Sequence, residues 1–283
     1  MAEATVRERK DVVYGRGGGR DLRLDLYEPA GERLDTAVIL IHGGGWTRGD
    51  RSQLAEHARA LAADGFVALS MEYRLLGESP FPGMIHDVKA AIRWVRSNAA
   101  MLGIDPAKVC LQGHSAGAHL ALLAAGTPDD ARLDAPDADR GVSTAVAAVV
   151  AVYPPVRFHL GDERPSGSLP ARHLLGDGAT EEAAGLASPI AHVTPSFPPT
   201  LLTHGDADKV VPFSASLRMW DALREAGVPV DAQLHAGLPH GFAGMPEVRP
   251  ALMASVTAFF RRHVAQRDQF QAALAARAGA AAR

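Results

Sequence analysis

The amino-acid sequence predicts an α/β fold, in which a mostly parallel sheet carries helices on both faces. Continuous apolar runs are typical of strands buried on both faces, and several occur along the chain. Stretches with helical periodicity or helix-like composition separate them. Strands that alternate with helices pair in parallel, because each helix returns the chain across one face of the sheet. The predicted buried strands are residues 37–41, 66–70, 108–111, 145–153 and 200–203.

Composition and charge indicate one globular domain. The chain has 283 residues, of which 47% are hydrophobic, enough for one large core. Its formal net charge is −3 and it contains no block of basic residues, so no nucleic-acid partner is expected. The single cysteine, Cys110, excludes an internal disulfide and fits a reducing compartment. Because neither an apolar signal segment nor a membrane-length apolar run is found, we expect a cytoplasmic protein without a membrane span.

The N-terminal region predicts an antiparallel hairpin followed by a glycine-rich loop. Apolar and polar residues alternate over 22–27, after a glycine cluster and the short apolar run 12–14, a pattern typical of two strands joined by a turn. The buried strand 37–41 ends in a loop of sequence His-Gly-Gly-Gly-Trp at residues 42–46. Three consecutive glycines let the backbone turn tightly and direct its N–H groups inward. Such a loop can bind the oxyanion that forms when a nucleophile attacks a carbonyl group.

Helical segments are predicted after this loop. Asp50 and Gln53 have the spacing of a capping box, so we expect a helix from there to about residue 64, with Gly65 as its C-terminal stop. Residues 84–98 carry apolar side chains at helical spacing. Asp87 lies near the start of this second helix, where we expect it to cap the helix or to form an ion pair.

The segment 111–118 contains a nucleophile motif. Ser115 is flanked by Gly113 and Gly117, and it lies between the apolar run 108–111 and the helix-like run 118–125. In a sharp strand-to-helix turn, a serine at the apex is exposed to a base, while side chains two residues before and after it would collide. Ser115 is therefore the candidate nucleophile. The motif is short enough to occur by chance, so the interpretation depends on an oxyanion loop, an acid and a histidine elsewhere in the chain.

Residues 154–199 interrupt the alternation of strands and helices. The segment contains several prolines and glycines and only short apolar runs, and it is too long for an ordinary loop. In an open α/β sheet, an insertion beyond the carboxyl end of a strand covers the site, so we expect a small cap over the pocket. Arg157, Phe158 and His173 are candidates for substrate contact, although a surface position is the simpler interpretation of each.

Acidic residues and histidines follow the last predicted strands. Strand 200–203 precedes a turn with Asp206 and Asp208, and strand 230–234 leads to His235 and His240. Either aspartate has the residue type needed to orient a catalytic histidine. His240 lies in a Pro/Gly loop from which its imidazole can reach the edge of the sheet, whereas His235 is still at the strand end. The chain order Ser, Asp, His matches that of a hydrolytic catalytic triad.

The C-terminal part of the chain predicts helices and a tail. A helix is expected from about residue 213 to 226, where Gly227 ends it. A second helix, at 252–264, closes the domain. Residues 265–283 are rich in alanine and arginine and predict a frayed helical tail.

Together these motifs resemble those of the α/β-hydrolase carboxylesterases, particularly the hormone-sensitive-lipase-like branch and the bacterial feruloyl- and acetyl-esterase branch. The resemblance rests on residues 42–46, 113–117, 204–212 and 239–242, and it extends over about residues 24–263. It implies the α/β-hydrolase fold, with a mostly parallel eight-stranded sheet and helices on both faces. The chain is then a single domain of residues 1–283, with residues 154–199 as a small cap insertion.

The resemblance also implies the roles of individual residues. The family's H-G-x-x-D-x-x-V-P pattern selects Asp208 rather than Asp206 as the acid. The implied site consists of Ser115 as nucleophile, Asp208 as acid, His240 as base, the backbone N–H groups of Gly44, Gly45 and Ala116 as oxyanion hole, and Trp46 and His114 as substrate contacts.

The implied activity is hydrolysis of short- to medium-chain carboxylic esters through an acyl-enzyme intermediate, with no metal or organic cofactor. An arylformamidase-like amidase or a small peptidase would use the same triad, so both stay open here. A non-enzymatic binding protein on this fold is a third interpretation, which the presence of His240 disfavours. We expect a small-molecule ester as the partner, and a monomer or a homodimer.

This sequence departs from the family pattern in one respect. Only residues 1–41 precede the glycine-rich loop, whereas hormone-sensitive-lipase-like enzymes carry a long helical segment there. The N-terminal part of the cap is therefore expected to be missing, which predicts a more open pocket.

Overall fold

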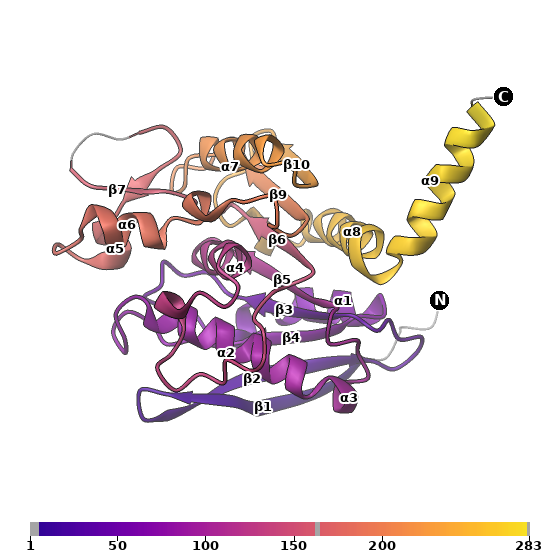
Figure 1. The fold of residues 1–283 in the computed structure, drawn as a ribbon, viewed down its shortest axis with the longest axis horizontal. Coiled ribbons are helices and arrows are strands. Elements are labelled where there is room, and N and C mark those ends of the chain that lie inside the picture. The colour runs from indigo at the N-terminus through magenta and orange to yellow at the C-terminus, as the bar shows by residue number, and fades with distance from the viewer. Residues whose placement is uncertain (1–5, 162–164, 282–283) are drawn as a thin grey trace.

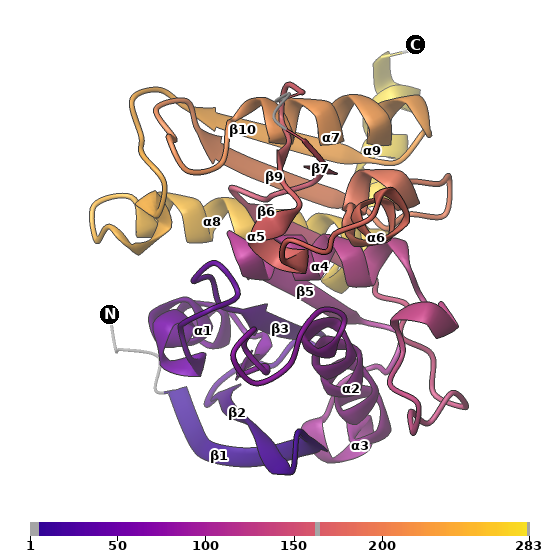
Figure 2. The ribbon, with the colours of Figure 1, turned by 90° about the vertical axis from the view of Figure 1, so that its left-hand side faces the viewer.

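The computed structural model describes residues 6–161 and 165–281 and is built around an eight-stranded sheet. The strand order is β1-β2-β4-β3-β5-β6-β9-β10, so the N-terminal hairpin forms one edge and β10 the other (Figure 2). Strands β1, β2 and β4 pair antiparallel, and all other neighbours pair in parallel. The strands are β1 (Val6–Gly17), β2 (Arg20–Pro29), β3 (Ala37–Ile41), β4 (Val67–Met71), β5 (Val109–His114), β6 (Ala148–Val152), β9 (Thr200–Gly205) and β10 (Val230–His235).

Helices cover both faces of this sheet (Figure 1). One face packs against α2 (Gly83–Ser97), α4 (Ala116–Gly126) and α7 (Ser214–Glu225). The other face packs against α1 (Ala55–Ala63) and α8 (Arg249–Phe260). The predicted mostly parallel sheet with helices on both faces is therefore confirmed. The shorter elements that connect these helices and strands are η1 (Arg51–Leu54), α3 (Ala99–Leu102), η2 (Ala131–Leu133), η4 (Phe242–Gly244) and the π-helix η5 (Arg261–Ala265).

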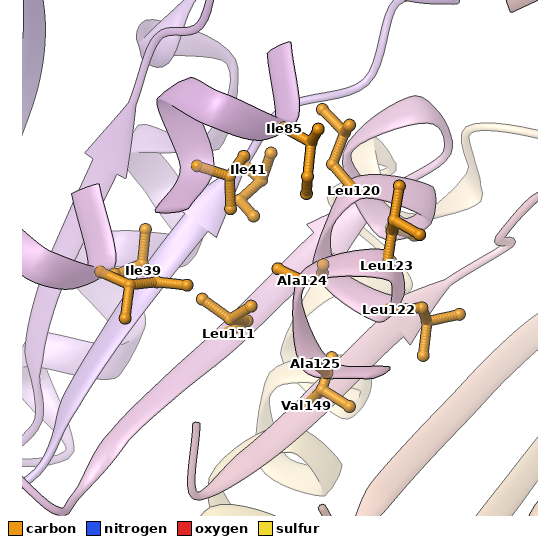
Figure 3. Close-up of a cluster of buried hydrophobic side chains, with 14 of the residues drawn as sticks. Ile39, Ile41, Ile85, Leu111, Leu120, Leu122, Leu123, Ala124, Ala125 and Val149 are labelled. Atoms are coloured by element: carbon orange, nitrogen blue, oxygen red, sulfur yellow. The ribbon is translucent and has the colours of Figure 1, made fainter. Parts of the chain in front are cut away.

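The alternation of side chains along the central strands creates two cores. In β3, Ile39 and Ile41 face the core under α2 and α4, whereas Val38 and Leu40 face the core under α1 and α8. Figure 3 shows how Ile39 and Ile41 meet side chains of α2 and α4 on the first face. These residues are fully buried, and burial of each such side chain contributes about 1.5–3 kcal/mol to folding. The sheet is thereby fixed between two layers of helices.

The connections place several loops at one edge of the sheet. From β3 the chain passes to β4 on one side, and α2 then carries it back to β5 on the other side. The strand order thus reverses next to β3, and in open α/β sheets ligands bind at the carboxyl ends of strands at such a point. The loops that follow β3, β5, β6, β9 and β10 all leave this edge, because these strands are parallel.

Some predicted boundaries differ from the observed ones. The strand predicted at 145–153 spans only Ala148–Val152, and β5 continues past residue 111 to His114. The helix predicted from residue 50 begins with the 3₁₀ turn η1 before α1. Its capping box is incomplete, because the Asp50 carboxylate accepts from the Ser52 N–H (2.7 Å) rather than from that of Gln53. The helix predicted at 84–98 agrees with α2 to within one residue.

The segment 154–199 contains short elements only. They are β7 (Phe158–His159), β8 (Leu169–Pro170), α5 (Arg172–Leu175), α6 (Glu181–Ala187) and η3 (Pro189–His192). The segment packs beside α4, where Leu174, Ala184 and Ala187 join the core of that face. Residues 162–164 lie outside the described part of the chain.

The C-terminal residues form α9 (Arg267–Ala281), which extends away from the rest of the molecule (Figure 1). The predicted helical tail agrees with this element, except for residues 282–283, which lie outside the described part. Among the described residues, no helix combines the length and the hydropathy needed to cross a membrane.

Candidate active site

Ser115 occupies the sharp turn between β5 and α4. Its backbone has φ 53° and ψ −117°, a conformation that is strained for a residue with a side chain. The Ser115 N–H donates to the Val152 carbonyl at 2.9 Å, which ties the turn to the neighbouring strand β6. Because α4 begins at Ala116, the positive end of its dipole lies at the same place. The turn therefore has the backbone geometry of a nucleophile elbow.

The two glycines of this motif are required for different reasons. A Cβ atom at Gly113 would lie 2.2 Å from the Gly117 carbonyl oxygen, so the predicted collision across the turn is found here. A Cβ atom at Gly117 would instead meet strand β3, at 2.1 Å from the carbonyl oxygen of Ile41 and 2.4 Å from that of His42. Gly117 therefore permits the elbow to approach the loop that follows β3.

Ser115, His240 and Asp208 form a continuous chain of hydrogen bonds. Ser115 Oγ lies 2.8 Å from His240 Nε2, and His240 Nδ1 lies 2.6 Å from Asp208 Oδ2. A nucleophilic serine needs a base at such a distance, and the base needs a carboxylate to orient it. The three residues follow β5, β9 and β10, so the parallel sheet brings them together from distant positions in the sequence.

The aspartate and the histidine that the sequence analysis did not select point elsewhere. The Asp206 side chain is exposed and accepts a hydrogen bond from the Gly237 N–H at 2.6 Å. His235 Nε2 lies 2.9 Å from Thr203 Oγ1, and its ring packs against Phe242. Asp208 and His240 are thus the aspartate and the histidine that reach Ser115.

The Asp208 carboxylate is held by hydrogen bonds on both oxygens. Oδ1 accepts from the N–H groups of Val210 and Val211, at 2.8 and 2.9 Å, and Oδ2 accepts from His240. Burial by itself would raise the pKa of Asp208, but hydrogen bonds from His204, His240 and the two N–H groups outweigh burial. The pKa of Asp208 is therefore far below its usual range, and the group is an anion at neutral pH.

His204 also contacts this carboxylate, a role that the sequence analysis did not assign. Its Nε2 lies 3.1 Å from Asp208 Oδ2, and its Nδ1 lies 2.8 Å from Ser216 Oγ of α7. The side chain is fully buried. His204 is a positioning residue, since it fixes the carboxylate without reaching Ser115. The sequence does contain a signal for His204, because this histidine lies four residues before the proposed acid, at the end of a buried strand.

The loop after β3 supplies backbone donors beside Ser115. Gly44 and Gly45 have φ values of 121° and 62°, which residues with side chains rarely adopt. A Cβ atom at Gly44 would lie 2.0 Å from the Arg48 carbonyl oxygen, so this position also needs glycine for space. Within the described residues, the N–H groups of Gly44, Gly45 and Ala116 donate to no other protein group. They are free to bind an oxyanion.

A cavity of about 440 Å³ opens at Ser115. The loop after β3, the first turns of η1 and α1, the elbow, Tyr153 and the His240 loop form its walls. None of the described residues of 154–199 lines this cavity, so the predicted covering role of that segment stays a prediction. Its lining residues are Gly43, Gly44, Gly45, Thr47, Arg48, Gln53, Leu54, His57, His114, Ser115, Tyr153, Val210, His240, Gly241 and Gly244.

Tyr153 is a second residue that the sequence analysis did not select. It directly follows β6 with a φ of 44°, and its ring centroid lies 4.5 Å from that of His240. Because β6 lies between β5 and β9, its carboxyl end points between Ser115 and Asp208. The Tyr153 ring packs against the imidazole of His240 and restricts its position. Burial raises the pKa of the Tyr153 hydroxyl, so it stays neutral at neutral pH.

Of the two predicted substrate contacts, only His114 reaches the cavity. Trp46 is buried, and its indole N–H donates to His119 Nδ1 at 3.2 Å. Its ring also packs near Phe158, so Trp46 fixes the loop after β3 against α4 and the 154–199 segment. His114 lines the cavity and lies edge-on to His57, with ring centroids 4.7 Å apart.

The candidates from the 154–199 segment divide in the same way. Phe158 is buried against Trp46 and His119, whereas Arg157 and His173 are exposed.

Asp87, expected to cap a helix or to form an ion pair, binds the Arg74 guanidinium, with Arg74 Nη2 at 2.6 Å from Asp87 Oδ1. Cys110 is buried within β5, which raises the pKa of its thiol and makes it a core residue.

The buried histidines beside the site are neutral at pH 7. Burial lowers the pKa of His57 and of His119, in each case to about 4, and also lowers that of His114. Among the residues that the structure describes, no three His, Cys, Asp or Glu side chains form a group that could hold a metal ion. The groups that meet at Ser115 are its hydroxyl, the imidazole of His240, the carboxylate of Asp208 behind it and the backbone N–H groups of the loop after β3.

The chain is similar to known esterases in sequence and in fold. The chain matches the BD-FAE family model over residues 24–223. It is 32% identical over 264 residues to the esterase LipQ of Mycobacterium tuberculosis, an alignment covering 89% of this chain and 62% of LipQ. The chain thus spans about three fifths of the length of this relative.

Two solved esterase structures are similar over nearly their whole length. Esterase 2 of Thermogutta terrifontis shares 30% identity with a TM-score of 0.76 and covers 93% of this chain and 93% of its own. It has also been solved phosphorylated by paraoxon. A truncated carbohydrate esterase from gut microbiota shares 28% identity with a TM-score of 0.79, covering 93% of this chain and 98% of its own.

Proposed function

The chain belongs to the BD-FAE family of α/β-hydrolase esterases, and from this membership we propose that it is a serine carboxylesterase acting on short- to medium-chain esters. Its fold is the α/β-hydrolase fold that the sequence predicts. The observation that carries the proposal is the chain of hydrogen bonds from Ser115 through His240 to Asp208, at a cavity lined by free backbone donors.

In the first half of the reaction, Ser115 becomes acylated. His240 Nε2 accepts the Ser115 proton while Oγ forms a bond to the ester carbonyl carbon. Asp208 stabilises the resulting imidazolium through the hydrogen bond at Nδ1. The N–H groups of Gly44, Gly45 and Ala116 bind the oxyanion, at about 3–4 kcal/mol for each donor. The bond to the alcohol oxygen then breaks, and His240 gives its proton to the departing alcohol.

In the second half, water releases the acid. His240 takes a proton from a water molecule, whose oxygen attacks the acyl carbon. The same backbone donors bind the second oxyanion. The bond between this carbon and Ser115 Oγ breaks, and His240 returns the proton to Oγ. No residue other than these is needed for proton transfer, because one imidazole serves as base and acid in turn.

The size of the cavity supports a limit on the acyl chain. About 440 Å³ lies near the lower end of the range for small-molecule sites, so it accommodates a short to medium chain more readily than a long one. We therefore expect the turnover of 4-nitrophenyl esters to peak among the short and medium acyl chains.

The test is hydrolysis of a 4-nitrophenyl ester series, from acetate to long-chain acyl groups, by the wild type and two serine variants. Ser115→Ala should lose at least about a thousandfold in kcat. Ser255→Ala, which removes a hydroxyl from α8 outside the cavity, should match the wild type. A mass spectrum after paraoxon treatment should place one adduct on Ser115, which Ser115→Ala prevents.

Two results would contradict the proposal. One is a wild type that is inert on every ester but hydrolyses anilides or aryl formamides, which would favour the amidase or peptidase alternatives. The other is full ester turnover by Ser115→Ala.

We also propose that residues 1–283 form a single domain, with residues 154–199 inserted as the cap. The cytoplasmic location and the choice between monomer and homodimer stay predictions. Light scattering of the purified chain would decide the oligomeric state, and fractionation of the source cells would decide the compartment.

A further inference from the structure

The cavity at Ser115 has an unequal distribution of charge. Among its described lining residues there is no carboxylate, and Arg48 is the guanidinium among them. The other polar side chains that line it are uncharged at neutral pH or belong to the proposed triad, such as Gln53 and His240. A substrate that enters this cavity therefore meets one positive side chain and no negative one.

Arg48 is not engaged by the protein itself. Neighbouring arginines are paired: Arg51 binds Asp25 and Glu72, and Arg74 binds Asp87. Within the described part of the chain, the Arg48 side chain makes no hydrogen bond or ion pair. The closest carboxylate in sequence, Asp50, accepts a hydrogen bond from the Ser52 N–H, and no ion pair joins it to Arg48. The guanidinium is exposed at the cavity and available to a ligand.

The backbone holds Arg48 beside the oxyanion loop. The Arg48 N–H donates to the Gly44 carbonyl at 3.2 Å. Arg48 Cγ lies so close to Gly44 that a Cβ atom there would be 3.2 Å from it. The side chain thus starts against one of the proposed oxyanion donors. An anion bound by Arg48 would belong to the same molecule whose carbonyl group faces Ser115.

Gln53 adds a second unpaired donor on the same wall. Gln53 lies on η1, shortly after Arg48 in the sequence, and it also lines the cavity. Within the region that the structure describes, its side-chain amide has no hydrogen-bond partner. A guanidinium fork with a nearby amide suits a carboxylate, because both oxygens can accept hydrogen bonds.

From these observations we propose that Arg48, assisted by Gln53, makes this enzyme select esters that carry a carboxylate in addition to the ester group. The inference rests on the proposed esterase function and names its substrate class. The guanidinium is a specificity-determining group and takes no part in proton transfer. Both the acyl side and the alcohol side of an ester can carry a carboxylate, and the two arms of the test separate these positions.

The test compares kcat/KM for matched anionic and neutral esters. On the acyl side, the pair is the mono-4-nitrophenyl ester of adipic acid and 4-nitrophenyl hexanoate. On the alcohol side, the pair is 4-(butanoyloxy)benzoate and its methyl ester. Arg48→Gln should lower the anionic-to-neutral ratio of kcat/KM about five- to tenfold for one of the pairs, mainly through KM. Turnover of the neutral esters should change less than about twofold.

The controls separate a local contact from a general effect of charge. Arg218→Gln removes another exposed guanidinium, on α7 and outside the cavity, and should leave both ratios unchanged. Arg48→Lys keeps the charge but not the fork, and should keep part of the preference. Raising the salt concentration should reduce the wild-type ratio towards that of Arg48→Gln, because screening weakens an exposed pair.

The possible failures are distinguishable. If the wild type hydrolyses esters but Arg48→Gln leaves both ratios unchanged, this inference is wrong and the esterase proposal stands. An equal decrease in Arg218→Gln also overturns it, because the preference then reflects net charge. If no ester is hydrolysed at all, the proposed function fails and this inference fails with it.

Discussion

Hydrogen bonds hold both oxygens of the Asp208 carboxylate at the candidate site. It accepts hydrogen bonds from His240, His204 and two backbone N–H groups, so its position and its charge are both fixed. Asp206 lies two residues away and is exposed, with a single bond from the Gly237 N–H. The chain therefore provides its own matched pair of aspartates for testing the proposed acid.

Replacing each of the two aspartates by asparagine should have very different effects on kcat. Asp208→Asn removes the charge that stabilises the imidazolium and permits the wrong tautomer of His240, so we expect kcat to fall about 10⁴-fold. Asp206→Asn should change kcat less than about twofold. Steady-state kinetics on a 4-nitrophenyl ester measure both. A large loss in Asp206→Asn, or a small one in Asp208→Asn, would exchange the assigned roles.

His204 explains why the acid is so well held. Its buried ring connects Asp208 to Ser216 on α7, so the carboxylate is fixed to a helix as well as to its own turn. In sites that must be rigid, a functional side chain is commonly held in its orientation by a neighbouring side chain that does not itself react. The position of the proposed acid thus depends on α7 as well as on the loop that carries Asp208.

At the level of elements, the turn between β5 and α4 packs against the end of β3 and the loop that follows it. Gly117 is a point of close approach, because a Cβ atom there would overlap the carbonyl oxygens of Ile41 and His42. The same approach places the free N–H groups of Gly44 and Gly45 beside Ser115. Packing of two elements, rather than any one side chain, therefore forms the proposed oxyanion site.

We expect Gly117→Ala to destabilise the protein and to reduce activity. The β3 carbonyl groups are backbone atoms within a sheet and cannot move aside cheaply, so the cost should be about 1–3 kcal/mol. Urea unfolding followed by circular dichroism measures this cost.

A matched substitution controls for the general effect of alanine. Gly185 lies in α6 with open space around the position of a Cβ atom and without a positive φ. Gly185→Ala should be neutral or stabilising by up to about 1 kcal/mol, because alanine favours a helix. Equal destabilisation by both substitutions would contradict the packing explanation.

At the scale of the whole molecule, buried histidines link stability to pH. His57 is 2% exposed, and its ring joins α1 to the segment before α8 through a hydrogen bond to the Ala243 carbonyl at 3.1 Å. Burial, together with the charge of Arg249, lowers its pKa to about 4. In the unfolded chain a histidine has a pKa of about 6.5. Between these values the unfolded chain binds a proton that the folded protein does not.

The sign of the effect follows from this difference. The stability contributed by neutral His57 is fully present above about pH 6.5 and is lost as the pH falls towards 4. The wild type should therefore lose about 3 kcal/mol more than His57→Gln over this window. Urea unfolding at a series of pH values measures the difference. His173→Gln, at an exposed position, should follow the wild type, and identical pH curves for all three proteins would refute the prediction.

Much of the fold, and the residue types of the candidate site, could be predicted from the order of the amino acids. Apolar runs at 37–41 and 200–203 and the helical spacing at 84–98 located strands and a helix, because each depends on burial patterns that are local in sequence. The Gly113-Ser115-Gly117 motif also predicted the sharp strand-to-helix turn, because so tight a turn accepts few residue types beside the serine. The start of β6 and the 3₁₀ turn η1 were not predicted, because apolar runs do not reveal where pairing begins.

Several contacts at the candidate site are visible in the folded chain alone. The sequence analysis already favoured His240 over His235, but the contacts of His204 with Asp208 and of Tyr153 with His240 depend on loop paths. Trp46 lies in the core and Arg48 at the cavity, although both belong to one loop. The physical reason is that a sequence pattern records the environment of a residue along its own element. Contacts among β5, β6, β9 and β10 arise instead from the order of the strands in the sheet, which brings together groups far apart in the chain.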